Sequence, residues 1–187
     1  MTLSTPQPAG PGIPHPKPST SSSDATTRSG FRFHIRPASP DDEPALADFF
    51  RHVSRDDMRF RFLSAVREVG HERLAAMTAV DHDRTEDFLA IDPASGAIIA
   101  TAMLAADPGR ERAEVAIAIR EDYKRRGISW TLLEHVTRHA RQQGFKLLES
   151  IESRDNRAAI ELEREMGFSV ETVPGDATLV IVRRRLD

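Results

Sequence analysis

The 187-residue sequence contains no cysteine, and this absence excludes several kinds of chemistry at once. Such a chain forms no disulfide, holds no cysteine-ligated zinc and makes no cysteine acyl-enzyme. It also lacks any apolar run near the roughly 18 residues of a membrane span, and Met1 is not followed by the basic-then-apolar order of a secretory signal. We therefore expect a soluble cytoplasmic protein without a membrane partner.

The sequence also lacks an excess of positive charge. Lys and Arg number 26 against 29 Asp and Glu, which gives a formal net charge of −3. Binding to a phosphate backbone usually needs a basic surface, so we expect no nucleic-acid partner. A chain of this length suits one ordinary domain with a single active centre.

The first thirty residues have few bulky apolar side chains and many Pro, Ser, Thr and Gly. Such a segment cannot bury enough surface to offset the entropy of ordering it. We therefore predict a disordered tail over 1–30, with a docking or modification segment as the alternative, and one domain over 31–187.

From Phe31 onward the apolar periodicity alternates between that of strands and that of helices. The predicted strands cover residues 31–36, 88–91, 97–104, 115–119, 147–151, 169–172 and 178–182. The predicted helices begin at Ser39, Ser54, Glu72, Gly127 and Asn156. This order of elements predicts an α/β fold with a mixed sheet flanked by helices.

A short basic segment stands out in this acidic chain. Lys124, Arg125 and Arg126 directly precede Gly127, which opens a helix after an apolar strand, and Ser129 adds a hydroxyl. The amino end of a helix offers unpaired N–H groups and a partial positive charge, and both favour a pyrophosphate. The alternative is a solvated basic patch on the surface.

Two motifs at matching distance resemble those of the GNAT superfamily of N-acetyltransferases. Lys124, Gly127 and Ser129 stand at the key positions of the family's pyrophosphate motif, with Lys124 and Ser129 as departures from its usual residues. The second segment, 156–168, begins with Asn156 and ends with Gly-Phe, like the family's second signature. The resemblance covers residues 31–187 and implies the GNAT fold, in which two central parallel strands splay apart around acetyl-CoA.

The resemblance also implies roles for individual residues. The backbone of Ile117, Ala118 and Ile119 would hold the pantetheine arm, and Asn156 would face the cofactor, with helix capping as the alternative for Asn156. The residues that would wrap the pyrophosphate are Lys124, Arg125, Arg126, Gly127, Ile128, Ser129 and Trp130. No metal site is implied.

Glu114 is the candidate general base. It opens the most apolar strand and alternates there with Ala116 and Ala118, and a charge that enters a buried strand needs a partner or a purpose. The alternative is a carboxylate that points to solvent. The segment Ala113–Ala116 also resembles the Ala-Glu-Phe-Ala segment of Pat-type bacterial protein-lysine acetyltransferases, whose glutamate is the general base. Further similarity to that subfamily lies in 35–37, 41–43 and 59–62.

The resemblance leaves the acceptor and one catalytic group open. Many family members carry a proton-donating tyrosine seven residues after the helix-opening asparagine, where this chain has Glu163, and Tyr123 lies elsewhere. A protein lysine is the expected acceptor, with a small amine or an amino acid as runner-up. A non-catalytic acyl-CoA sensor is the alternative from another class.

Three other polar groups have structural explanations. The run 81–83 could ligate a metal but is more typical of a polar turn. His135 and His139 are four apart on a helix, a spacing that a solvated face also produces. The run 183–185 could contact an acidic partner but is expected to charge the edge of a final strand against aggregation.

Overall fold

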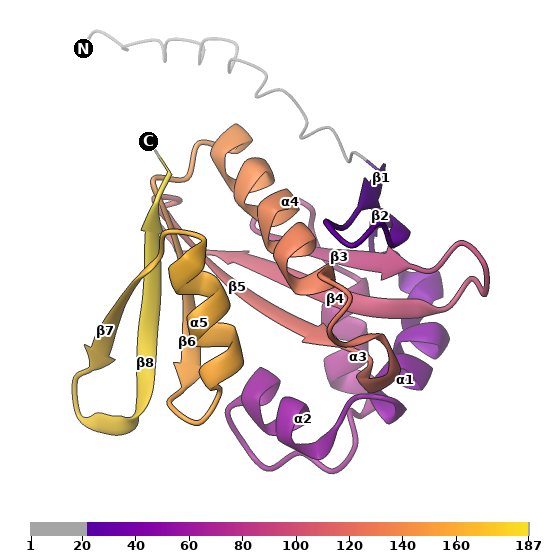
Figure 1. Ribbon diagram of the computed structural model, residues 1–187, viewed down its shortest axis with the longest axis horizontal. Helices are drawn as coiled ribbons and strands as arrows, with labels where there is room; N and C mark the ends of the chain where they lie inside the picture. The colour runs from indigo at the N-terminus through magenta and orange to yellow at the C-terminus, as the bar shows by residue number, and fades with distance from the viewer. Residues whose placement is uncertain (1–21, 187) are drawn as a thin grey trace, which may run out of the picture.

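The computed structural model describes residues 22–186, and within them eight strands form one sheet in the order β1-β2-β3-β4-β5-β6-β8-β7 (Figure 1). Neighbouring strands are antiparallel except β5 and β6, which run parallel. The strands are β1 Ser23–Thr26, β2 Arg32–Pro37, β3 Thr85–Ile91, β4 Ile98–Ala106, β5 Arg112–Ile119, β6 Leu147–Ser153, β7 Ser169–Val173 and β8 Asp176–Arg185.

Helices cover both faces of this sheet (Figure 1). One face carries α1 Glu43–Arg51, α2 Arg55–Phe62 and α3 His71–Thr78, and the other carries α4 Ile128–Gln142 and α5 Arg157–Glu165. Two short 3-10 turns, Pro40–Asp42 and Glu121–Tyr123, precede α1 and α4. The structure confirms the predicted mixed sheet flanked by helices.

Each face of the sheet has its own apolar core. On the α4 face, Leu132, Val136 and Ala140 lie on one stripe of α4 and are fully buried against the sheet. On the other face, Leu46 and Phe49 of α1 are buried in the second core. Truncating a fully buried leucine such as Leu132 to alanine typically costs about 2–5 kcal/mol, so both layers are needed for stability.

The sheet opens at its centre. β5 and β6 pair only at Arg112–Leu147, Ala113–Leu148 and Glu114–Glu149. Beyond Glu114, β5 continues alongside β4 alone and β6 continues alongside β8 alone. The two parallel strands therefore separate, as the resemblance implied.

The prediction of a disordered tail through Gly30 is wrong for residues 22–30, whereas residues 1–21 lie outside the described residues. β1 pairs antiparallel with β2, and buried Thr27 closes the turn that follows β1, with its N–H donating to the Phe31 carbonyl at 2.8 Å. Hydrogen bonding to an existing strand orders this segment despite its low apolar content.

Two further predictions are corrected by the topology. β8 lies between β6 and β7, so 183–185 is not at the edge of the sheet, and Arg183 instead pairs with Glu149 at 2.9 Å and with Glu171 at 2.7 Å. His135 and His139 do not form a solvated face, because both rings pack edge-on against buried Phe88.

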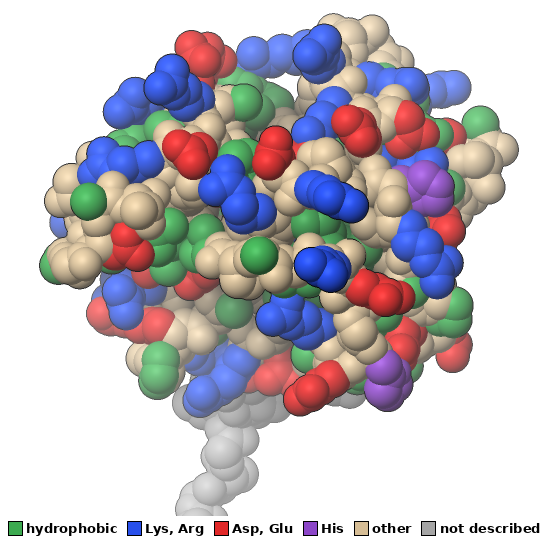
Figure 2. All heavy atoms as spheres, turned by 90° about the horizontal axis from the view of Figure 1, so that it is seen from below, with side chains coloured by type: hydrophobic (Ala, Val, Ile, Leu, Met, Phe, Trp, Pro, Cys, Tyr) green, Lys and Arg blue, Asp and Glu red, His purple; other side chains and the backbone are tan. Residues whose placement is uncertain are grey.

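The outer surface carries charge of both signs. On the face seen from below Figure 1, positive and negative side chains are interspersed, so the described residues there form no continuous basic area (Figure 2). Within residues 22–186, no helix combines the length and the apolar character that crossing a membrane requires.

Candidate functional site

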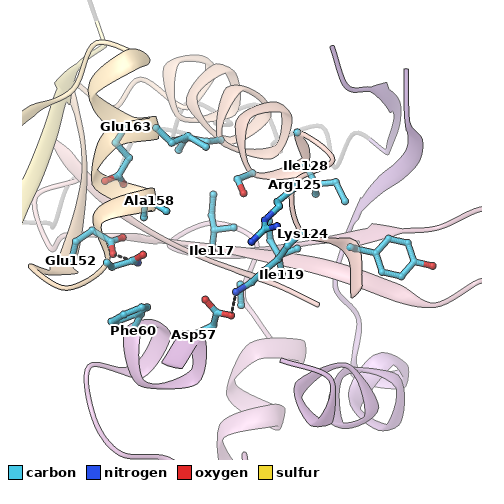
Figure 3. A pocket seen from close by; sticks show the side chains of 18 of the residues that line it. Asp57, Phe60, Ile117, Ile119, Lys124, Arg125, Ile128, Glu152, Ala158 and Glu163 are labelled. Atoms are coloured by element: carbon cyan, nitrogen blue, oxygen red, sulfur yellow. Dashed lines mark hydrogen bonds and ion pairs between the residues drawn. The ribbon is translucent and has the colours of Figure 1, made fainter. Parts of the chain in front are cut away.

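A cavity of 480 Å³ occupies the gap between β5 and β6. Its walls come from β5, the loop before α4, α2, and the β6–α5 connection (Figure 3). The cavity therefore passes through the opening in the sheet, and side chains from both helical layers reach it. A cavity of this size and depth suits a small-molecule ligand.

The loop before α4 forms one end of the cavity. Arg125 and Gly127 have positive φ values of 61° and 82°, and this backbone path turns the chain into α4 at Ile128. Gly127 takes the N-cap position without a side-chain cap, so the first N–H groups of the 15-residue helix have no intrahelical partner. These donors and two basic side chains favour an anion at this end.

The β1–β2 turn braces this loop from behind. Ser29 Oγ donates to the Arg126 carbonyl at 2.9 Å, and a Cβ placed on Gly127 would lie 3.2 Å from Thr27 Cβ. The Arg28 guanidinium stacks 4.0 Å from the centre of the Trp130 ring. Residues far apart in the sequence thus fix the shape of the loop.

An ion pair of Lys124 and cation–π contacts of Arg126 hold the loop from other sides. Lys124 forms an ion pair with Asp57 of α2, which ties the loop to the opposite wall of the cavity (Figure 3). Arg126 does not line the cavity, and its guanidinium lies over the rings of Phe31 and Tyr123. Of these two basic residues, only Lys124 faces the cavity.

Carboxyl groups form the far wall of the cavity. Glu152, at the end of β6, accepts a hydrogen bond from Asn156 Nδ2 at 2.7 Å, and Glu163 of α5 accepts one from Ser150 Oγ at 2.5 Å. Burial raises the pKa of Glu152 to about 8, and the negative charge of Glu163 adds to this effect. Burial also raises the pKa of Glu163 to about 7, against the hydrogen bond from Ser150. Glu152 is therefore mostly protonated at neutral pH, while Glu163 keeps part of its negative charge.

Glu114 lies where the gap begins. It is the last β5 residue paired with β6, and its partner is Glu149. Burial raises the pKa of Glu114, the negative charge of Glu149 raises it further, and Arg61 lowers it. The side chain still reaches solvent. This carboxylate therefore has an environment that strengthens it as a base while keeping it accessible.

A buried polar cluster lies beneath Glu114 on the α2 face. Arg61 is partly buried, and its Nη2 donates to Met103 Sδ at 3.6 Å. Asp87 is fully buried, accepts a hydrogen bond from the Thr101 hydroxyl, and has its pKa raised to about 7 by that burial. The charge of Arg61 acts on both Asp87 and Glu114, so this guanidinium links the buried carboxyl to the exposed one.

Comparison with known protein families agrees with a cofactor site in this cavity. Residues 47–168 match the Acetyltransferase (GNAT) family, which accounts for more than half of the chain. The chain belongs to this family. It is an acetyltransferase that uses acetyl-CoA as its acetyl donor.

Relatives support the assignment at the level of sequence and fold. An acetyltransferase from Pseudomonas aeruginosa is 29% identical over 154 residues, which cover 81% of this chain and 83% of the relative. The GNAT domain of S. lividans PAT superposes with a TM-score of 0.82 at 22% identity, over 88% of this chain and 97% of that domain. A Salmonella typhimurium structure with its cofactor acetyl-CoA has a TM-score of 0.67 at 20% identity, covering 83% of this chain and 94% of that one.

The structure brings most of the predicted site residues of the acetyltransferase together. The predicted residues that line the cavity are Ile117, Ala118, Ile119, Lys124, Arg125, Gly127, Ile128, Ser129 and Asn156. Glu114, Arg126 and Trp130 do not line it. Asn156 holds the N-cap position of α5, but its side chain makes no cap bond and donates to Glu152 instead.

Sequence reasoning missed several residues that line the cavity of this acetyltransferase. They include Asp57, Phe60 and Glu152, while Glu163 and Tyr123 were considered only in connection with the missing proton-donating tyrosine. The Tyr123 hydroxyl donates to Asp92 Oδ2 at 2.8 Å, so it is already engaged. Glu152 was missed because the predicted strand ended at residue 151, whereas β6 continues to Ser153.

Neither the cavity nor the acidic turns supply a metal site. Among the residues that the structure describes, no group of three or more His, Asp or Glu side chains is placed to hold a metal ion. Asp81 instead accepts hydrogen bonds from the backbone N–H groups of Asp83, Arg84 and Thr85, and His82 contacts Glu86. The run 81–83 is therefore a polar turn.

Proposed function

We propose that this acetyltransferase transfers acetyl to a primary amine, with a protein lysine as the acceptor, by direct attack in a ternary complex. The lysine is favoured by the Ala113–Ala116 segment, which resembles that of Pat-type lysine acetyltransferases. The shared fold of the S. lividans PAT domain fits this choice. A small amine or an amino acid is the second candidate, because acceptor loops vary freely on one fold.

We propose that acetyl-CoA lies along the cavity, with its pyrophosphate at the loop end. Lys124, Arg125 and the free N–H groups after Gly127 supply the positive potential there. The backbone of Ile117–Ile119, which lacks a β6 partner, supplies hydrogen-bonding groups for the pantetheine arm. Arg126 and Trp130 act from behind by holding the loop in place.

Glu114 is the proposed general base, and the observation that carries this role is where the pairing of β5 and β6 ends. The strands separate directly after Glu114–Glu149, so this carboxylate stands at the apex of the gap, on the α2 side of the sheet. A lysine amine has a pKa of about 10.4 and arrives protonated at neutral pH. Since Glu114 does not line the cavity, a water relays the proton from the amine to its carboxylate.

The transfer follows from these positions. The neutral amine attacks the thioester carbon, the C–N bond forms and the C–S bond breaks. Backbone N–H groups on the side of β5 that has no β6 partner polarise the thioester carbonyl. Because the sequence has no cysteine, no cysteine acyl-enzyme takes part.

Labelled acetyl-CoA and a cell lysate test the acceptor class. We expect label on protein lysines, detected by mass spectrometry as acetylated peptides. Label confined to small molecules would reject a lysine acceptor and leave acetyl transfer itself intact. Heat-inactivated enzyme controls for chemical acetylation by the donor.

The variant Glu114→Gln tests whether Glu114 is the general base, with the acceptor found in the labelling experiment as substrate. Removal of a general base typically lowers the rate about 10²- to 10⁴-fold, so we expect kcat to fall in that range with little change in acetyl-CoA affinity. Higher pH should partly restore the rate, since more of the amine then arrives deprotonated. Glu111→Gln, in an exposed pair with Lys146, is the matched control. A Glu114→Gln variant that retains most of its activity at neutral pH would show that another group takes the proton.

A further inference from the structure

The register of β5 and β6 places a second carboxyl across the gap from the proposed pantetheine strand. The last paired residues are Glu114 and Glu149, and three residues further along each strand stand Ile117 and Glu152. Both of these residues line the cavity. Glu152 therefore faces the cavity from the strand opposite the one that is proposed to hold the thioester end of the cofactor (Figure 3).

The two carboxyls belong to opposite faces of the sheet. Side chains alternate along a strand, and Ser150, two residues before Glu152, hydrogen-bonds to Glu163 of α5. Glu152 therefore projects to the face of the sheet that carries α4 and α5. The loop before α4, which forms the other end of the cavity, lies on the same face. Glu114 lies on the α2 side, where Arg61 acts on it. An amine that enters from the α2 side would displace a sulfur toward the Glu152 side.

Neighbouring groups hold Glu152 in its protonated form. Burial raises the pKa of Glu152 to about 8, and the negative charge of Glu163 adds to this effect, whereas the hydrogen bond that Asn156 Nδ2 donates to one carboxyl oxygen lowers the pKa. The other charged groups that line the cavity are Asp57 with its partner Lys124, and Arg125 on the loop. At neutral pH Glu152 thus carries a proton inside the cavity.

We propose that Glu152 is a catalytic residue that protonates the CoA sulfur as it leaves. The inference rests on the proposed direct attack. As the amine nitrogen bonds to the carbonyl carbon, the C–S electron pair moves to sulfur and the Glu152 O–H proton follows it. The proton that leaves the amine passes through solvent and restores the Glu152 carboxyl. The net reaction converts acetyl-CoA and an amine into an amide and CoA, with no other reactant.

Glu163 is less suited to this role although it lies nearby. Its Oε1 is engaged by Ser150, and its Oε2 is buried without a hydrogen-bond partner among the described residues. Neither oxygen is therefore available to a sulfur in the cavity. Its contribution is to keep the neighbouring carboxyl protonated, which makes Glu163 a positioning residue for Glu152.

The test compares Glu152→Gln with wild type in a CoA-release assay. Glutamine keeps the shape and can still accept from Asn156, but it has no acidic proton. Because a thiolate is a tolerable leaving group, we expect kcat to fall about 10²-fold, the low end for a general acid, with KM for acetyl-CoA within a factor of about two. Glu161→Gln, the same change at an exposed position of α5, should leave kcat unchanged.

The pH profile separates proton donation from a packing role. Wild-type kcat should fall as the pH rises past about 8, where Glu152 ionises, and Glu152→Gln should lack this alkaline limb. A variant with wild-type kcat and an unchanged alkaline limb would overturn the proposal. If wild type releases no CoA with any amine, the proposed function fails instead, and that outcome is seen before any variant is made.

Thermal unfolding checks the protonation state without any acceptor. A carboxyl with a raised pKa holds its proton in the folded protein but loses it in the unfolded chain from about pH 4.5 upward, so it reduces stability progressively between about pH 4.5 and 8. We expect the melting temperature of Glu152→Gln to fall less than that of wild type over this window. Equal slopes for the two proteins would show that Glu152 is ionised at neutral pH and would overturn the proposal.

Discussion

The two ends of the cavity are built in opposite ways. The loop end is basic, exposed and contributed mainly by one contiguous segment, Lys124–Ser129, whose backbone N–H groups point outward from α4. The far end is acidic, more buried and assembled from separate elements, with Glu152 from β6 and Glu163 from α5, while Glu114 of β5 stands outside the cavity lining at the apex of the gap. Permanent charge suits binding a polyanion, whereas carboxyls with raised pKa values suit moving protons.

The difference between the ends implies that binding and chemistry can be changed independently. Variants at the loop should alter the affinity for acetyl-CoA and leave kcat unchanged. Variants at the carboxyl end should lower kcat and leave the affinity for acetyl-CoA unchanged. A loop variant that lowered kcat at saturating acetyl-CoA would break this division. The following changes test it, from the largest expected effect to the smallest.

The largest effect is expected from Ser129→Asp. Ser129 lines the cavity in the first turn of α4, where a carboxylate is favourable for the helix but repels a phosphate. Two charges about 4 Å apart near a protein surface interact by about 4 kcal/mol, so we expect acetyl-CoA to bind at least about 100-fold more weakly, as measured by calorimetry. Ser129→Asn, similar in size but neutral, should bind within a few fold of wild type. Equal affinity of the two variants would place the pyrophosphate elsewhere.

Ser129 is a cleaner choice than Gly127 for this test. Gly127 has a φ of 82°, and any Cβ there would lie 3.2 Å from Thr27. A glutamate at Gly127 would therefore combine backbone strain and a steric contact with the added charge. Lost binding in that variant would not separate electrostatics from damage to the fold.

A smaller effect is expected from removing the β1–β2 turn. Deleting residues 1–30 eliminates the bond from Ser29 to Arg126 and the stacking of Arg28 on Trp130. A hydrogen bond and a cation–π contact contribute about 1–2 kcal/mol together, so KM for acetyl-CoA should rise about 10-fold. Deleting only residues 1–21 should leave KM and the melting temperature unchanged. Equal KM values for the two truncations would show that the turn does not shape the loop.

The smallest effect is expected from Asp57→Asn. Asp57 pairs with Lys124 and so competes with a phosphate for that ammonium group. An ion pair at the surface contributes about 0.2–1 kcal/mol, and this one is partly exposed, so its removal should strengthen acetyl-CoA binding about two-fold, with a smaller gain at high salt. Asp56→Asn, one residue earlier on the same helix, is the control. Weaker binding by Asp57→Asn would mean that Asp57 contacts the cofactor directly.

The same contrast explains what could be predicted from the sequence. The helix that begins after Gly127 and the strand at 115–119 follow from local signals, and so does the basic loop. The role proposed for Glu152 depends on the register of β5 against β6, two strands that are separated in the sequence by the whole of α4. A contact between strands so far apart leaves no local pattern in the chain.

The sequence analysis missed the amino-terminal strand β1 for a related reason. Residues 23–26 are polar except for Ala25, and their order comes from hydrogen bonds to β2 and from the fit of Thr27 against Gly127. Composition predicts disorder for such a segment, because it counts apolar surface and not available backbone partners. The wrong prediction that residues 183–185 lie at the edge of the sheet has a similar origin, because only the strand order shows that β7 lies outside β8.

The gap in the sheet has a consequence for self-association. Between Val115 and Ile119, one side of β5 carries backbone groups with no strand partner, which makes an edge in the middle of the molecule. Unpaired edges are templates for strand addition by other chains. Here α2 packs against one face of β5 and α4 against the other. A narrow, extended molecule can therefore reach the open edge of β5, but a strand of a second sheet cannot. These helices therefore keep an open edge available to a narrow ligand while protecting the protein from aggregation.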